Sequence, residues 1–157
     1  MIKPYKISVP KSTLNNIYKK VRAYPWKMMQ NVNGWEYGTN YNFLKKISQY
    51  WVSKYNWKKF ENKINSFKNY KTNVDGINLH FIIEKSKNPK SRPLLLLHGW
   101  PGSVIEFFDI IPRLAHPEQF GGKIEDGFDV IVPSLPGFGF STPIKKALGP
   151  RRIGKIL

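Results

Sequence analysis

The apolar positions of the first 70 residues recur at the spacing of amphipathic helices. Ser12, after Pro10, is the expected cap of the first helix, because its hydroxyl can accept a hydrogen bond from a free backbone N–H group. Pro25 ends that helix near Tyr24. The apolar face of the helix is formed, at intervals of three and four residues, by Leu14, Ile17, Tyr18 and Val21.

The same spacing predicts two further helices before residue 70. A loop from Met28 to Gly38 precedes them. Thr39 is the expected cap of the second helix, and the third begins near Asn56. The apolar stripe of the second helix is Phe43, Leu44, Ile47, Tyr50 and Trp51, and that of the third is Phe60, Ile64 and Phe67.

After Ser66 the apolar period becomes that of a β-strand. Residues 77–83 alternate in strand spacing, and Asp75-Gly76 before them is a strong signal for a two-residue hairpin turn. Residues 93–97, a proline followed by four leucines, form a continuous apolar run. Such a run predicts a central strand that is buried on both faces.

A helix is expected directly after this central strand. Ser103 and Glu106 have the spacing of a capping box, and Pro112 predicts a kink or a restart. Residues 128–132 predict another strand, and Gly149-Pro150 predicts the start of a last helix. The buried stripe of the expected central helix is Val104, Phe107, Phe108, Ile111, Leu114 and Ala115.

The order of these elements indicates an α/β fold. Strands that alternate with helices after residue 70 imply a mainly parallel sheet, which carries its chemistry on loops at the carboxyl ends of strands. We therefore expect two domains, a helical region of residues 1–70 and an α/β core of residues 71–157 that holds only the first half of its sheet.

The composition narrows the class of protein. Apolar residues make up 41% of the 157 residues and aromatic residues 15%, which is too many for a disordered chain. The absence of cysteine excludes disulfides, thiolate metal sites and a cysteine nucleophile. No run approaches the roughly 18 apolar residues of a membrane span, and the N-terminus lacks an apolar signal core. We expect a soluble, cytoplasmic chain without a transmembrane segment.

Positive charge is concentrated in the N-terminal part of the chain. The net charge is +16, and residues 1–92 hold 19 Lys and Arg against 4 Asp and Glu. Such an imbalance can indicate a surface for nucleic acid or for an anionic membrane. Lysine greatly outnumbers arginine and accompanies abundant asparagine. We therefore favour compositional drift and expect no nucleic-acid partner.

Two glycine-rich loops are the candidates for chemistry. The first, His98 to Ser103, joins the four leucines to the next helix, and a rigid turn there can aim backbone N–H groups at a developing negative charge. Pro101 is a candidate for a cis peptide bond after Trp100. The second, Pro133 to Ser141, is expected to close one side of a pocket. Ser141 is a poor candidate for a nucleophile, because no strand-turn-helix elbow surrounds it.

These loops resemble those of a known family. Residues 98–101 resemble the His-Gly-x-Pro oxyanion motif of α/β-hydrolases, and residues 128–141 resemble the next strand and the Pro-Gly-x-Gly-x-Ser loop of that fold. Residues 3–84 resemble the N-terminal region of microsomal and juvenile-hormone-type epoxide hydrolases. The matching segments are Pro4 to Pro10, Trp35 to Gly38, Tyr50-Trp51, Asn56-Trp57 and Asp75 to Phe81.

The resemblance implies a reaction and a role for four residues. Epoxide hydrolases of this type open a small-molecule epoxide to a vicinal diol through an aspartyl ester, which a histidine-activated water then hydrolyses, with no metal or organic cofactor. The backbone N–H of Trp100 would help to hold the oxyanion. His98, Gly99 and Pro101 would form the framework of that loop, and His98 would be a structural histidine rather than the base.

The family's nucleophile segment, Gly-Gly-Asp-Trp-Gly, does not occur in the sequence. None of the four aspartates (Asp75, Asp109, Asp126 and Asp129) lies at an elbow, and the acid and base are also missing. Residues 149–153 still resemble the helix that precedes the elbow. We interpret the chain as the N-terminal part of an epoxide hydrolase, truncated before the nucleophile and inactive alone.

Three other interpretations remain open. The chain could be an inactive gene remnant with no selected function, which the sequence cannot separate from the first interpretation. The chain could be part of another α/β-hydrolase, such as an esterase or a haloalkane dehalogenase, in which case the elbow would differ. It could also be a non-catalytic basic module, as suggested by three lysine pairs, Lys19-Lys20, Lys45-Lys46 and Lys58-Lys59.

Overall fold

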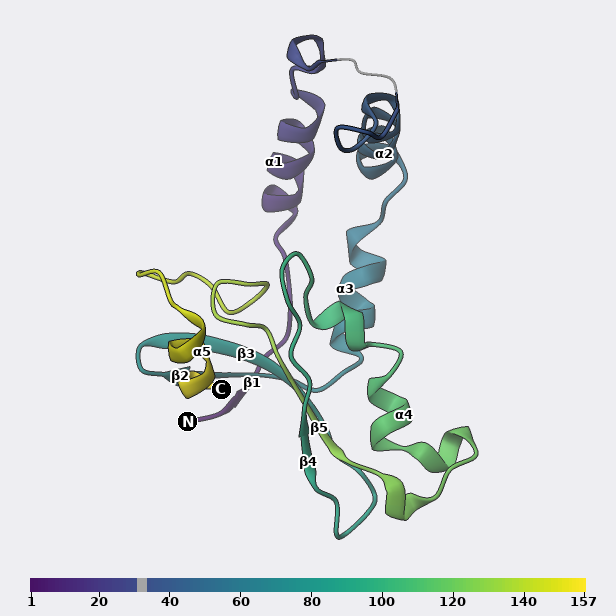
Figure 1. Cartoon of the computed structure of the whole chain (residues 1–157), viewed down its shortest axis with the longest axis vertical. Helices are drawn as coiled ribbons and strands as arrows, with labels where there is room; N and C mark the ends of the chain where they lie inside the picture. Colours follow the sequence, from purple (N-terminus) through teal and green to yellow (C-terminus); the bar gives the residue numbers. More distant parts are fainter. Residues whose placement is uncertain (31–33) are drawn as a thin grey trace. The chain divides into compact units, whose positions relative to one another are not determined.

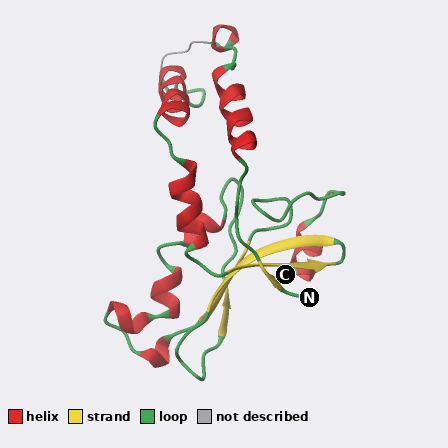
Figure 2. Ribbon diagram, turned by 180° about the vertical axis from the view of Figure 1, so that it is seen from behind, coloured by secondary structure: helices red, strands yellow, loops and turns green. Residues whose placement is uncertain are grey.

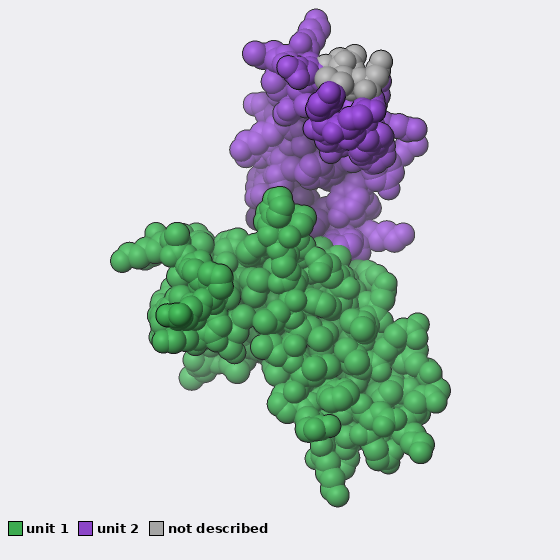
Figure 3. Space-filling view, in the orientation of Figure 1, with its two compact units in different colours: residues 1–7, 62–157 green, residues 8–61 purple. Residues whose placement is uncertain are grey.

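The computed structural model describes residues 1–30 and 34–157, and these form two compact units (Figure 3). The sheet unit consists of Met1–Ile7 and Asn62–Leu157, and the helical unit consists of Ser8–Glu61. Residues 31–33 of the loop expected between Met28 and Gly38 lie outside the described residues. No helix in the described ranges is long and apolar enough to cross a membrane.

The sheet unit is built on five strands in the order β1-β2-β3-β5-β4 (Figures 1 and 2). The strands are β1 (Lys3–Pro4), β2 (Asn69–Val74), β3 (Ile77–Glu84), β4 (Pro93–Leu95) and β5 (Asp129–Pro133). Only β4 and β5 run parallel, and the other three pairings are antiparallel. The prediction of a mainly parallel sheet is therefore wrong for the described residues. The tight two-residue turn between β2 and β3 permits only an antiparallel pair, whereas the long helical segment between β4 and β5 makes a parallel crossover.

The hairpin between β2 and β3 confirms the Asp-Gly signal. Asp75 and Gly76 both have positive φ, 51° and 79°, as the tight turn requires. Lys3 and Pro4, which fall in the region predicted to be helical, instead pair with Lys71 and Tyr70 of β2. Two residues are too few to show a period in the sequence, so β1 could not be predicted.

The core of the sheet unit lies on both faces of β3. Phe81 and Ile82 point to opposite faces, and both are buried. Val130 and Val132 of β5 are fully buried beside them. The apolar side chains of both strands are therefore shielded from water. Their burial is the main source of stability in this unit.

The prediction of a central strand at residues 93–97 is wrong in part. The strand β4 is only three residues long and lies at the edge of the sheet. Leu95 is 43% exposed and Leu97 is 50% exposed. The leucines of this run are therefore not covered on both faces, and no strand of the described chain pairs with the outer edge of β4.

The helix expected after β4 is divided into two short elements. These are the 3₁₀ helix η2 (Val104–Phe107) and α4 (Ile111–Ala115). Pro112 lies in the first turn of α4, so the predicted restart is confirmed. Ser103 makes no side-chain capping bond, so the predicted capping box is wrong. Four positions of the predicted stripe are buried: Val104, Phe108, Ile111 and Ala115.

Three short helices complete the sheet unit. The 3₁₀ helices η3 (Pro117–Phe120) and η4 (Ile124–Asp126) connect α4 to β5. The helix α5 (Pro150–Ile156) begins with Pro150 at its first turn, as predicted, and follows Gly149.

The helical unit contains α1 (Lys11–Arg22), η1 (Trp26–Met28), α2 (Tyr41–Ser53) and the start of α3 (Trp57–Asn65). Two of the predicted caps are wrong. Pro10, not Ser12, precedes α1 and forms no side-chain bond, and Asn40, not Thr39, caps α2 by accepting the Phe43 N–H at 3.0 Å. Asn56 precedes α3 as predicted, and it accepts the Lys59 N–H at 3.2 Å. Neither α1 nor α2 contains a buried residue.

Glu61 is the main polar anchor of the helical unit. Its carboxylate accepts hydrogen bonds from the Lys58 ammonium at 2.6 Å, the Val9 backbone N–H at 2.7 Å and the Trp57 indole N–H at 2.9 Å. The hydrogen bond from Lys58, followed by that from Val9, lowers the pKa of Glu61 to about 2. The carboxylate therefore stays ionised at neutral pH and ties the chain before α1 to α3.

Candidate functional site

The two predicted loops follow two neighbouring strands and begin at the same end of those strands. His98 to Ser103 follows β4, and residues 134–142 follow β5. Because β4 and β5 are parallel neighbours, both loops begin at their carboxyl ends, where α/β folds place their sites. The two loops that the sequence indicated as candidates for chemistry therefore begin side by side.

His98 joins the two loops. Its ring is 3% exposed, and its Nε2 atom accepts the backbone N–H of Leu135 at 3.1 Å. The ring also packs edge-on against Phe138, with 5.2 Å between the ring centroids. Since Nε2 is an acceptor, the proton of the neutral ring lies on Nδ1, which is 3.4 Å from the carbonyl oxygen of Gly99. Both ring nitrogens are thus used within the protein.

The turn at residues 99–102 presents Trp100. The Gly102 N–H donates to the Gly99 carbonyl at 2.7 Å, and the Trp100–Pro101 peptide bond is cis, as the sequence suggested. Trp100 is 85% exposed. Across residues 1–30 and 34–157, no acceptor takes the backbone N–H of Trp100. That N–H is therefore available to a negatively charged group.

A buried polar network that sequence reasoning missed lies beneath the second loop. His80 of β3 is fully buried, and its Nε2 atom is 2.9 Å from Oδ1 of Asn69. The Asn69 amide nitrogen donates to the carbonyls of Ile64 and Phe67 at 2.9 and 2.8 Å. Its oxygen must therefore accept from Nε2, which leaves Nδ1 of His80 to accept the hydroxyl of Ser134 at 2.9 Å.

Ser141 closes this network from the other end of the loop. Its hydroxyl accepts the backbone N–H of His80 at 2.9 Å and donates to the carbonyl of Ser134 at 2.6 Å. The Ser134 N–H donates in turn to the His80 carbonyl at 2.9 Å. Ser141 is completely buried with its hydroxyl engaged on both sides, which gives a second reason why it is no nucleophile.

Burial is the main cause that lowers the pKa of His80, to about 4, and the charge of Lys71 adds to it. His80 is therefore neutral at neutral pH. The serine, histidine and asparagine are arranged like a nucleophile with its base and orienting group. Ser134 is only 1% exposed, however, so a substrate cannot reach its hydroxyl. The network holds the loop and does not perform the chemistry.

The four aspartates have structural roles. Asp75 pairs with Arg152 at 2.8 Å, Asp109 with Lys63 at 3.6 Å, and Asp129 with Lys85. Asp126 accepts the backbone N–H of Lys123 at 3.3 Å. The described residues include no cluster of three or more His, Asp or Glu that could hold a metal ion.

Two family models match the chain. Residues 2–107 match the model described as "Epoxide hydrolase N terminus", and residues 92–150 match the model of the alpha/beta hydrolase fold. The two matches overlap at β4 and the His98 loop. The first match alone covers more than half of the chain.

Individual relatives lead to the same family. A Stigmatella aurantiaca protein assigned to the epoxide hydrolases is 44% identical over 155 residues, covering 98% of this chain and 35% of the relative. Epoxide hydrolase 1 of Oryctolagus cuniculus is 37% identical over 151 residues, covering 92% of this chain and 33% of that protein. The chain thus spans about a third of the length of these relatives.

A solved structure shares the fold. The juvenile hormone epoxide hydrolase of the silkworm Bombyx mori superposes with a TM-score of 0.83 and 31% sequence identity, covering 99% of this chain and 37% of that one. The chain therefore belongs to the epoxide hydrolase family, of which it contains the N-terminal region and the first strands of the α/β-hydrolase fold.

Proposed function

We propose that this chain supplies the oxyanion-binding loop of an epoxide hydrolase that converts a small-molecule epoxide to a vicinal diol. The observation that carries the proposal is the free backbone N–H of Trp100. It lies in a turn that His98 fastens to the neighbouring loop through Leu135. A donor fixed before the charge develops stabilises an oxyanion without having to reorganise.

The four residues expected from the sequence take distinct roles in this proposal. Trp100 provides the N–H donor through its backbone, and Gly99 and Pro101 shape the turn around it. His98 is a positioning residue rather than the base, because both of its ring nitrogens face groups of the protein. The division into residues 1–70 and 71–157 stays a prediction about how the functional regions are organised.

The sequence contains no nucleophile elbow, so we also propose that the 157-residue chain has no hydrolase activity by itself. Purified chain incubated with styrene oxide is expected to form diol no faster than buffer does. Diol formation that rises in proportion to the concentration of the chain would contradict this expectation.

The role of Trp100 can be tested in a chimera. Residues 1–157 would replace the matching third of rabbit epoxide hydrolase 1, and the amide N–H of Trp100 would be removed by an amide-to-ester replacement. Loss of one oxyanion donor is expected to lower kcat by about 100- to 1000-fold. Trp100→Ala, which keeps the N–H, is the matched control and should lower kcat far less. Equal losses in the two variants would refute the role of the backbone donor.

Another α/β-hydrolase remains the alternative activity, because the oxyanion loop alone does not select the nucleophile. Sequencing the coding DNA beyond the Leu157 codon separates the two. An in-frame Gly-Gly-Asp-Trp-Gly elbow supports an epoxide hydrolase, whereas Gly-x-Ser-x-Gly supports an esterase. A nucleic-acid module is less favoured, because Lys58 of its lysine pairs is already bound to Glu61.

A further inference from the structure

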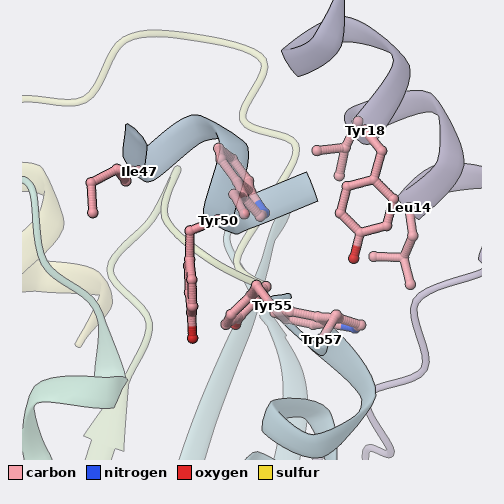
Figure 4. Close-up of a pocket in the computed structure, with 8 residues that line it drawn as sticks. Leu14, Tyr18, Ile47, Tyr50, Tyr55 and Trp57 are labelled. Atoms are coloured by element: carbon pink, nitrogen blue, oxygen red, sulfur yellow. The ribbon is translucent and has the colours of Figure 1, made fainter. Parts of the chain in front are cut away.

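The helical unit contains an apolar cleft with a volume of about 400 Å³ between α1, α2 and the start of α3 (Figure 4). Every side chain that lines it is aliphatic or aromatic. Ile17 comes from α1, and Tyr50 and Trp51 come from α2. Tyr55 lies between α2 and α3, and Trp57 is the first residue of α3. The volume falls within the range of about 300 to 1000 Å³ that is typical of small-molecule sites.

The cleft is accessible to solvent. Tyr50 is 52% exposed and Trp51 is 43% exposed, and no residue of α1 or α2 is buried. The apolar stripes of both helices therefore remain in contact with water. Covering them with an apolar ligand would remove that surface from water, which is favourable in proportion to the area covered.

A basic cleft of about 410 Å³ continues from the apolar one. The two share Leu14, Tyr18, Tyr55 and Trp57, and the second is also lined by Lys11, Lys54 and Lys58. Lys58 is bound to Glu61. Lys11 and Lys54 have no acidic partner among the described residues. Two lysines without an acidic partner thus line the cleft that adjoins the apolar one.

The positive charge of the helical unit favours a negatively charged ligand. The helical unit, residues 8–61, carries ten Lys and Arg against two Glu. A second copy of the same basic unit would be repelled from this surface, whereas an anion would be attracted to it. An apolar chain with one acidic head group matches both the aromatic cleft and its lysine end.

We propose that this cleft binds a free anionic amphiphile of the long-chain carboxylate class, with its alkyl chain against Tyr50 and Trp51 and its carboxylate at Lys11 and Lys54. The proposal is independent of the hydrolase activity, since none of these residues belongs to the loop at Trp100. The hydroxyls of Tyr18, Tyr50 and Tyr55 add hydrogen-bond donors beside the apolar surface.

Calorimetric titration of the full chain with dodecanoate, below the concentration at which it forms micelles, tests the proposal. Dodecanoate is expected to bind at one site, dodecanol at least about tenfold more weakly, and acetate not at all, because both the chain and the charge contribute. Absence of dodecanoate binding, or equal affinities for dodecanoate and dodecanol, would overturn the proposal.

Substitutions on α2 and just after it locate the site. Lys54→Glu is expected to weaken dodecanoate binding by about tenfold or more, because it reverses a charge at the head group. Lys46→Glu makes the same change of charge on an exposed part of α2 that lines neither cleft, and it should change the affinity less than about twofold. Equal losses would mean that only the net charge of the unit matters, and would overturn the assignment.

Ile47→Glu provides a test of the apolar part. Ile47 is 45% exposed, so the substitution should leave the fold intact while it places a negative charge in the path of the alkyl chain. It is expected to abolish dodecanoate binding, and an unchanged circular dichroism spectrum confirms folding.

A last measurement tests whether the chain binds to vesicles that contain phosphatidylserine. Binding to such vesicles without binding to monomeric dodecanoate would overturn the proposal in favour of a membrane surface.

Discussion

Protonation of His80 would place a positive charge among fully buried groups. The neutral ring receives the hydroxyl of Ser134 on Nδ1, and a protonated ring could not accept this bond. The folded-state pKa of His80 is about 4, compared with the ordinary value of 6.5. The unfolded chain therefore binds a proton at a higher pH than the folded chain does. The stability due to the neutral ring is complete above pH 6.5 and is lost as the pH falls toward 4.

We expect His80 to account for about 3 kcal/mol of lost stability between pH 7 and pH 4, since the difference in pKa is worth about 1.4 kcal/mol per unit. Urea unfolding of the chain and of His80→Gln at several pH values measures this contribution. The glutamine cannot ionise, so the variant should lack this part of the pH dependence. Parallel curves for the two proteins would show that His80 is not the group that titrates.

At the scale of single elements, the caps decide where the helices of the helical unit begin. Asn40 accepts the Phe43 N–H at 3.0 Å and also donates to the Gly34 carbonyl at 3.2 Å. Thr39, directly before it, forms no capping bond to α2. Both residue types are good caps, so the sequence alone could not decide between two adjacent positions.

Asn40→Ala is expected to destabilise the chain by about 1 kcal/mol, because an N–H group at the start of α2 loses its acceptor. Thr39→Ala is the matched control, and its effect should be no more than a few tenths of a kcal/mol. Urea unfolding followed by circular dichroism measures both. A larger loss for Thr39→Ala than for Asn40→Ala would reverse the assignment of the cap.

How far sequence reasoning succeeded depended on whether the signal was local. The hairpin was predictable because Asp75 and Gly76 are adjacent, and the loop of His98 because its residues are contiguous. The network of His80 was not predictable, because its partners are distant in the sequence. Asn69 lies 11 residues from His80, and Ser134 lies 54 residues from it. The edge position of β4 was equally hidden, since four leucines look the same in a central strand and at an edge.

At the scale of the whole molecule, charge and apolar surface are distributed unequally. The excess of lysine is concentrated in residues 1–92, whereas the run from Pro93 to Leu97 carries no charge at all. Charged side chains are one means by which proteins prevent an edge strand from pairing with another chain. Strand β4 lacks this protection, and Leu95 and Leu97 are exposed beside its free edge.

We therefore expect the isolated chain to self-associate through β4 as its concentration rises. Leu97→Lys should reduce the association, because it places a charge beside the edge. Ile124→Lys, at an apolar position of η4 that is exposed to a similar degree, is the control and should leave the association unchanged. Analytical ultracentrifugation measures the masses. A monomeric chain at all concentrations, with sharp and reversible unfolding, would contradict the expectation.

The network beneath the second loop also determines how the molecule can open. His80 is bonded to Asn69, Ser134 and Ser141, and the residue after Ser134 supplies the N–H that His98 accepts. The hairpin cannot separate from the loop without exposing several unpaired polar groups at once. Hydrogen exchange at His80, Ser134 and Leu135 should therefore proceed through a single cooperative opening. The loop that His98 binds through Leu135 is thus expected to be as resistant to local unfolding as the strand below it.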